Sequence, residues 1–268
     1  MDKKVCTLVT GACGGLGRAF VKILASKKEN LILTGTSESK LKQLKNDFKE
    51  EFKDVFVKTI VCDLSKKEDI ENLIKDISDS GLVVTKLINN AGVIIEGDLL
   101  RFEDEEILNA IRVNCEGTLD LTQKFLKVRD EKEKFEVLTV SSVASTYPIP
   151  HMAVYAATKA FLTSMMTSLA IELKKKNVVF TTVNPGGMAT TDAMKESIKA
   201  MGIGGKLSTV STEKVAKTAL KALKKGKTNV VPGFFNKVLV AISKPFSKRF
   251  MAINSGKIYA KAQAKRNF

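Results

Sequence analysis

A glycine-rich turn between the first predicted strand and the first predicted helix constrains this chain more than any other feature. Residues 5–10 predict a buried strand and residues 15–27 predict a helix. Glycines in such a turn let backbone N–H groups approach a pyrophosphate, and the helix N-terminus adds partial positive charge. The alternative, a glycine-rich turn without a ligand, fits the strand–turn–helix context less well. We therefore predict that the turn binds a dinucleotide, through Gly11, Cys13, Gly14, Gly15, Leu16 and Gly17.

The rest of the chain alternates predicted strands with predicted helices. The further strands are predicted at residues 31–35, 55–62, 86–89, 135–141, 177–184 and 228–231. The further helices are predicted at residues 39–51, 66–78, 103–127, 153–175 and 212–224, with a loose short-helix segment at 190–205. Continuous apolar strands that alternate with helices predict an α/β fold, with a parallel sheet covered by helices on both faces.

The length and the charge distribution of the chain indicate one large domain followed by a short basic extension. The 268 residues suit one α/β domain, which we place at residues 1–232, followed by a basic helical extension at 233–268. From residue 221 onward the chain has twelve Lys or Arg and no Asp or Glu, so the first 220 residues hold only +3 of the net charge of +15. The N-terminus predicts no signal peptide and the four cysteines have no metal-ligand spacing, so we expect a cytoplasmic protein without a metal.

A phenol, an ammonium group and a hydroxyl are spaced for acid–base chemistry. Tyr155 and Lys159 are four residues apart on a predicted helix and so share one face. A neighbouring ammonium group lowers the pKa of a phenol, which lets Tyr155 exchange a proton with a carbonyl or an alcohol. Ser142 ends a predicted strand and can bind the substrate oxygen, although Ser141 is a rival, and Asn114 can hold a water or a carbonyl near Lys159.

The end of the second strand bears on the choice of cofactor. An NAD site usually has Asp or Glu there for the ribose 2′-OH, and this chain has neither at that position. Thr36 and Ser37 can donate to a 2′-phosphate, and Lys40 or Arg18 can supply charge, although Glu38 lies close. We therefore predict NADP(H), with NAD(H) as the alternative.

Two further segments suit the cofactor. Asp63 follows the third strand and can accept from the adenine amino group, or it can cap a helix beside Leu64. Asn90, Ala91 and Gly92 follow the fourth strand, where short side chains suit close packing around a ribose.

Together these motifs resemble the short-chain dehydrogenase/reductase family over about residues 4–232. TGACGGLG is similar to the family's TGxxxGxG, residues 89–92 to NNAG, and Tyr155 with Lys159 to YxxxK, with Asn114 and Ser142 at the matching places. Pro185, Gly186 and Thr190 are similar to the cofactor residues after the sixth strand. The resemblance implies a Rossmann-like, doubly wound sheet of seven parallel strands and NAD(P)-dependent interconversion of a carbonyl and an alcohol. It also implies a homo-oligomer through the helices at 103–127 and 153–175.

The expected substrate region is mostly apolar. It comprises Tyr147 and Met201 together with Val143, Ile149, His151, Met152, Gly187, Met188 and Met194. Flexible Met side chains suit a bulky lipophilic ketone, steroid-like or 3-ketoacyl in type. His151, the only histidine, either touches substrate or makes a hydrogen bond within its loop.

Three interpretations of the basic extension stay open. It packs on the body with a solvated basic face, or it lies on an anionic membrane through Phe, Val and Ile side chains between its lysines, or, least favoured, it binds nucleic acid. We expect no nucleic acid, because no recognition motif occurs. The main alternative to a ketone reductase is a nucleotide-binding regulatory or membrane-associated protein with little turnover; an epimerase or dehydratase on the same fold is a weaker one.

Overall fold

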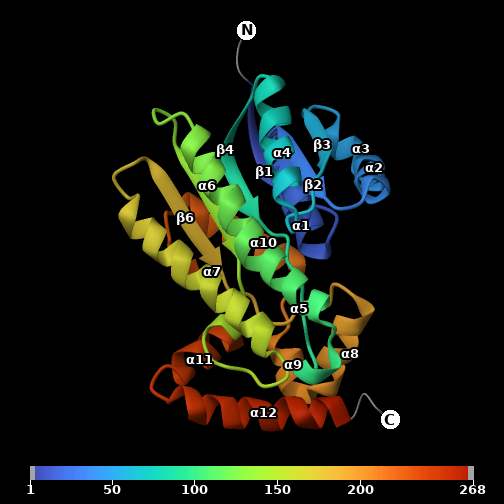
Figure 1. The fold of residues 1–268 in the computed structure, drawn as a ribbon, viewed down its shortest axis with the longest axis vertical. Coiled ribbons are helices and arrows are strands. Elements are labelled where there is room, and N and C mark those ends of the chain that lie inside the picture. The colour runs from blue at the N-terminus through green and yellow to red at the C-terminus, as the bar shows by residue number, and fades with distance from the viewer. Residues whose placement is uncertain (1–3, 265–268) are drawn as a thin grey trace.

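One twisted parallel sheet organises the molecule (Figure 1). The computed structural model describes residues 4–264. Its strands are β1 (Lys4–Val9), β2 (Leu31–Gly35), β3 (Val57–Val61), β4 (Leu82–Asn89), β5 (Phe135–Val140), β6 (Val178–Val183) and β7 (Asn229–Val230). All neighbours pair in parallel, in the order β3-β2-β1-β4-β5-β6-β7. The order reverses between β1 and β4, which opens a crevice at the carboxyl ends of these strands. The predicted doubly wound fold is confirmed.

Helices cover both faces of this sheet and one of its ends. They are α1 (Gly15–Ala25), α2 (Glu38–Asp47), α3 (Lys49–Phe52), α4 (Lys67–Asp79), α5 (Asp104–Ile111), α6 (Thr118–Val128), α7 (Ala153–Glu172), α8 (Asp192–Ala200), α9 (Gly202–Ser208), α10 (Thr212–Lys224), α11 (Phe234–Ser243) and α12 (Lys248–Ala264). Figure 1 shows α11 and α12 together at the end of the molecule opposite the N-terminus.

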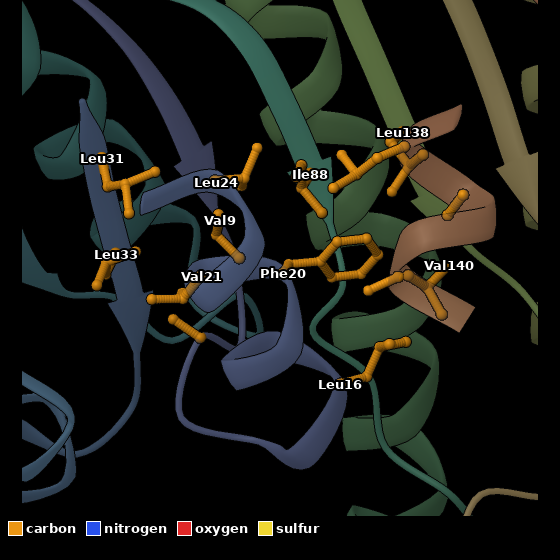
Figure 2. Packing of buried hydrophobic residues seen from close by; sticks show 14 of the residues in the cluster. Val9, Leu16, Phe20, Val21, Leu24, Leu31, Leu33, Ile88, Leu138 and Val140 are labelled. Atoms are coloured by element: carbon orange, nitrogen blue, oxygen red, sulfur yellow. The ribbon is translucent and has the colours of Figure 1, made fainter. Parts of the chain in front are cut away.

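Adjacent residues of the central strands pack into two separate hydrophobic cores, one on each face of the sheet. Val9 and Ile88 pack with Phe20 of α1, in a cluster that also includes α10; Figure 2 shows the Phe20 ring reaching toward Ile88. The preceding residues, Leu8 and Leu87, pack in the other cluster with α4, α6 and α7. Successive side chains of a strand point to opposite faces, so a strand buried on both sides must be apolar throughout.

Several boundaries differ from the sequence-based prediction. The helix predicted at 39–51 is interrupted at Phe48, which caps α2 and precedes α3. The fourth strand begins at Leu82, earlier than predicted, because residues 82–84 extend its pairing with β1. The helix predicted at 103–127 contains a π-helical segment, Arg112–Gly117, between α5 and α6.

The extension forms two helices that pack on the rest of the molecule. They are separated at residues 244–247, around Pro245; residues 265–268 of the extension lie outside the described part of the chain. Fully buried Asn236 of α11 donates to the carbonyl oxygens of Ser208 and Pro232 at 2.9 and 3.0 Å. Ser255 of α12 donates to the Pro148 carbonyl oxygen at 3.1 Å. Within residues 4–264 no helix has the length and apolar character of a membrane span.

Candidate active site

A cavity of about 920 Å³ lies over the carboxyl ends of the strands. Its walls come from the loops after β1, β2, β3, β4, β5 and β6, and from helices α7 to α9, α11 and α12. Apart from Arg18, the residues that the sequence assigned to the cofactor line this cavity: Gly11, Cys13, Gly14, Gly15, Leu16, Gly17, Thr36, Ser37, Lys40, Asp63, Leu64, Asn90, Ala91, Gly92, Tyr155, Lys159, Pro185, Gly186 and Thr190. Segments far apart in sequence therefore meet at one site.

The glycine loop forms a cradle that side chains would fill. Gly11 has a φ of +59°, a conformation that L-residues rarely adopt. A Cβ on Gly17 would lie 2.3 Å from the Gly11 carbonyl oxygen, and a Cβ on Gly15 would lie 2.8 Å from Thr190 Cγ2. Asn90 Nδ2 donates to the carbonyl oxygens of Thr10 and Gly11 at 2.9 and 3.0 Å and so fixes the turn from β4. This open, rigid turn before α1 fits the diphosphate of a nicotinamide cofactor.

The region after β2 fits a 2′-phosphate in part. Thr36, Ser37 and Lys40 line the cavity, and Ser37 also caps α2 by accepting from the Lys40 backbone N–H at 3.4 Å. The other expected cation, Arg18, does not line the cavity. Its guanidinium group pairs with Asp47 instead.

Asp63, two residues after β3, belongs to the loop before α4 and does not cap that helix, whose N-cap residue is Lys66. Asp63 lines the cavity, and its Oδ1 accepts from the backbone N–H and the hydroxyl of Ser65 at 2.9 and 2.8 Å.

Tyr155 and Lys159 lie on α7 beside the Ser142 loop. Lys159 Nζ lies 5.8 Å from the centre of the Tyr155 ring and donates to the Val140 carbonyl oxygen at 2.9 Å. Burial lowers the pKa of Lys159 to about 8. Burial raises the pKa of Tyr155, and a hydrogen bond with Ser142 opposes that rise. Desolvation outweighs this hydrogen bond, so the pKa of Tyr155 lies above its usual value and not below it as the sequence suggested.

The two serines differ in their surroundings. Ser141 Oγ donates to the Lys159 carbonyl oxygen and lies next to Thr163 Oγ1, both at 2.8 Å, so it holds β5 against α7. Ser142 Oγ has weaker intramolecular partners, with the Ala144 backbone N–H at 3.1 Å and the Pro185 carbonyl oxygen at 3.5 Å. The geometry favours Ser142 as the hydroxyl that is available to a ligand.

Asn114 lies behind the cavity, at the π-helical segment. It is fully buried, accepts from the Val93 backbone N–H at 2.8 Å and donates to the Val93 carbonyl oxygen at 2.8 Å and to Thr158 Oγ1 at 3.0 Å. A Cβ on Gly92 would lie 3.2 Å from both Asn114 Oδ1 and Lys159 Nζ. π-Helical turns are frequent at functional sites, and this one brings Asn114 to the strand-end loop.

The substrate end is largely as expected, with one correction. Val143, Ile149, Met152, Gly187, Met188 and Met194 line the cavity, and so do Tyr147 and Met201. His151 does not: it lines a separate small cavity beside Leu99 and Phe102. Its φ of +65° and the bond from the Gly97 N–H to its carbonyl oxygen, at 2.7 Å, fix the loop in that orientation.

Sequence reasoning missed the contribution of the extension to this cavity. Phe235 and Leu239 of α11 and Ser255, Ile258 and Tyr259 of α12 all line it. Burial and the nearby Glu96 carboxylate raise the pKa of Tyr259. The apolar pattern of residues 234–260 signals buried faces, but nothing in it indicates which surface they cover.

Glu96, also missed, places a carboxylate in the cavity wall. It accepts from Ser197 Oγ of α8 at 3.1 and 3.2 Å. Among residues 4–264 no group of three or more His, Cys, Asp or Glu is arranged to hold a metal ion.

Similar proteins agree with this geometry. The family model for short chain dehydrogenase matches residues 5–202. The very-long-chain 3-oxoacyl-CoA reductase of Neurospora crassa is 35% identical over 66% of this chain and 54% of its own length. The 3-oxoacyl-acyl-carrier-protein reductase FabG of Rickettsia typhi is 30% identical over 71% of this chain and 76% of its own length. The chain spans about half the length of the very-long-chain 3-oxoacyl-CoA reductases that it matches.

Solved structures agree in fold over most of the chain. A 7beta-hydroxysteroid dehydrogenase superposes with a TM-score of 0.81 at 23% identity, over 95% of this chain and 98% of the other. The L-sorbose reductase of Gluconobacter frateurii, solved with NADPH and L-sorbose, gives a TM-score of 0.74 at 20% identity, over 88% and 99% of the two chains. With the family model matching most of its length, the chain belongs to the short-chain dehydrogenase/reductase family.

Proposed function

We propose that this protein is an NADP(H)-dependent reductase that interconverts a ketone and a secondary alcohol on a bulky lipophilic substrate of the 3-oxoacyl type. One observation carries the proposal. Ser142, Tyr155 and Lys159 meet at a single cavity whose one end is a glycine cradle and whose other end is lined by apolar side chains.

Each of these residues has a distinct role in the proposed reaction. The bound nicotinamide supplies the hydride. Tyr155 donates its phenolic proton to the substrate oxygen, and its raised pKa keeps that proton in place at neutral pH. Ser142 donates a hydrogen bond to the same oxygen. Lys159 orients the nicotinamide ribose and offsets negative charge on Tyr155, while Asn114 holds the loop after β4 in position.

The choice of NADP(H) rests on the residues after β2. No carboxylate of that segment lines the cavity, whereas Lys40, Thr36 and Ser37 do. These donors suit a phosphate better than a ribose hydroxyl.

The substrate class rests on the cavity wall and on the relatives. Beside the Glu96 carboxylate, the wall away from the glycine cradle contains Met, Ile, Phe and Tyr side chains, which suit a lipophilic chain or ring system. The matched relatives carry the name 3-oxoacyl reductase. A steroid ketone is the second substrate that this wall suits.

We further propose that the catalytic domain comprises residues 1–232 and that it forms a homo-oligomer through α5, α6 and α7. Leu108 and Ile111 of α5, Leu119 of α6 and Phe161 of α7 are exposed apolar side chains. Exposed apolar side chains on neighbouring helices are typical of a subunit interface.

Absorbance of the reduced nicotinamide tests the activity. We expect the wild type to oxidise NADPH faster than NADH with 3-oxoacyl thioesters, and to a lesser extent with steroid or simple ketones. Tyr155→Phe removes the proton donor and should lower turnover by about 10³-fold without weakening NADPH binding. Tyr147→Phe, a second tyrosine of the same cavity, is the matched control and should stay near wild type. Tight NADPH binding without turnover on any ketone would instead identify a nucleotide-binding regulatory protein.

A further inference from the structure

The outer faces of α11 and α12 are apolar where a solvent-facing helix is ordinarily polar. On α11, Phe234, Val238 and Ile242 recur at intervals of four, and Phe234 is 83% exposed and Ile242 57% exposed. Residues four apart lie on one face of a helix, so these side chains form one outward stripe. The opposite face of α11 carries the buried Asn236 and Ser243, so the helix is already packed on its polar side.

A second stripe continues on α12 and on the turn before it. Phe246 and Phe250 stack with ring centres 4.8 Å apart, and Ile253, one turn further, is 50% exposed. Ser255 and Tyr259 lie on the opposite side of α12, toward the cavity. Both helices therefore present apolar residues to solvent as well as to the interior of the protein.

The charges around both stripes have one sign. Lys237, Lys244, Lys248, Arg249 and Lys257 are all exposed, and the chain has no Asp or Glu after residue 213. None of the ion pairs found within residues 4–264 involves these five side chains. A second copy of this acid-free surface would repel the first, which disfavours self-association through it.

Apolar side chains at the centre and basic side chains at the border fit an anionic lipid surface. Phe and Ile enter the boundary between headgroups and acyl chains, while Lys and Arg contact lipid phosphates and carboxylates. We propose that α11 and α12 form a docking face for anionic phospholipid bilayers, with Phe234, Ile242, Phe246, Phe250 and Ile253 inserted at the interface.

The docking face adjoins the mouth of the cavity. Phe235 and Ile258 line the cavity and are also exposed, Ile258 to 56%. The helices that touch the lipid therefore form part of the substrate wall, and a lipophilic molecule in the bilayer has a short path into the cavity. The lipid contact itself does not depend on which ketone the protein reduces.

Flotation of the purified 268-residue chain with vesicles tests the docking face. The vesicles are phosphatidylcholine alone, or phosphatidylcholine mixed with phosphatidylserine. We expect binding to the mixed vesicles only, weakened by salt. The variant K237Q/K244Q/K248Q should partition on the order of a hundredfold less, because each basic residue near an anionic surface favours binding by roughly fivefold.

The matched control moves the same charge change to another surface. Lys174, Lys175 and Lys176 are exposed and follow α7 at the start of β6, away from the docking face. K174Q/K175Q/K176Q should bind the mixed vesicles as the wild type does. Equal loss in both triple variants would show a nonspecific effect of net charge and overturn the proposal.

A second pair of variants tests insertion of the stripe. Phe234→Ser and Phe250→Ser remove the most prominent rings and should each weaken binding by about tenfold, with unchanged circular dichroism and NADPH affinity. Full binding by both variants would overturn insertion. Wild type that ignores mixed vesicles would overturn the lipid surface as the partner, and a change from oligomer to monomer in Phe234→Ser would show that a second copy covers the face.

Discussion

The two ends of the cavity are built in different ways. The nucleotide end is made by strand-end loops of the sheet, where backbone atoms approach one another closely around Gly11 and Gly17. The substrate end is made by α8, α9, α11 and α12, which pack over the sheet edge through side chains. The matched family region ends at residue 202, so α11 and α12 lie beyond it. The comparison teaches that one end of the cavity is held by backbone geometry, whereas the other end is held by side-chain packing of helices that include two beyond the matched family region.

The largest effect is expected from a single methyl group in the nucleotide end. In Gly17→Ala the Cβ would lie 2.3 Å from the Gly11 carbonyl oxygen and 2.8 Å from that of Ala12. Backbone atoms cannot move away without strain. We therefore expect the turn to be destabilised by about 3 kcal/mol and NADPH binding to be roughly a hundredfold weaker. Fluorescence titration with NADPH measures it.

Gly204→Ala is the matched control at the substrate end. Gly204 lies in α9, and no atom lies within 4 Å of its added Cβ. NADPH binding should stay within about twofold of wild type, since Ala also favours a helix. Equal loss in both variants would contradict the contrast between the two ends.

The next effect concerns Lys159, whose burial lowers its pKa to about 8. An unfolded Lys has a pKa of about 10.4, so the unfolded chain binds more protons between these values and wild-type stability rises with pH across that window. Below about pH 8 Lys159 is charged in both the folded and the unfolded chain, so the folded protein bears the full free-energy cost of burying that charge. Lys159→Met should therefore raise the free energy of unfolding by about 2 kcal/mol near pH 7, after the lost hydrogen bond to Val140 is subtracted.

Denaturant unfolding at about pH 7 and about pH 10 measures this effect. The gain in Lys159→Met should shrink at the higher pH, and turnover should be lost at both. Exposed Lys174→Met is the control and should leave both quantities near wild type. A stability gain that does not depend on pH would mean that packing, and not the buried charge, is responsible.

Much of the nucleotide end could be predicted because its signals are local. The glycine turn, the Asn-Asn-Ala-Gly segment and the Tyr155–Lys159 pair each carry their conformation in a few adjacent residues. The strand Leu31–Gly35 and the helix Thr212–Lys224 were predicted with their observed bounds, since each is an uninterrupted periodic segment. The π-helical turn at Asn114 was not predicted, because it depends on the hydrogen bonds from Asn114 to Val93 across the fold.

Which residues line the substrate end could be predicted less well from the sequence. His151 is close to Tyr155 in sequence, but the left-handed backbone at His151 places it in another cavity. The apolar positions of α11 and α12 were recognised, yet their contact with the cavity depends on long-range bonds such as Ser255 to the Pro148 carbonyl oxygen. Periodicity shows that a helix face is buried and cannot name the surface that buries it.

An intermediate effect is expected from α12 in the cavity wall. Tyr259→Ala removes a ring that packs with Tyr147 and Tyr155 in one apolar cluster. We expect the KM for a bulky ketone to rise about tenfold, equivalent to about 1.4 kcal/mol of lost contact, with unchanged NADPH affinity. Steady-state kinetics separates the two, and Tyr259→Phe, which keeps the ring, should stay within about threefold of wild type. A matching loss of NADPH affinity would show that α12 supports both ends of the cavity.

The smallest effect concerns the 2′-phosphate at the nucleotide end. Lys40 lines the cavity, whereas Lys42 on the same helix pairs with Glu38 at 2.7 Å and does not. Lys40→Ala should weaken NADPH binding by about five- to tenfold and leave NADH binding unchanged, because an exposed ammonium–phosphate contact contributes about 1 kcal/mol. Lys42→Ala should alter neither. The loss in Lys40→Ala should shrink as salt screens the contact. Equal weakening of NADPH and NADH would place Lys40 beside the diphosphate, and the residues after β2 would then no longer explain a preference for NADP(H).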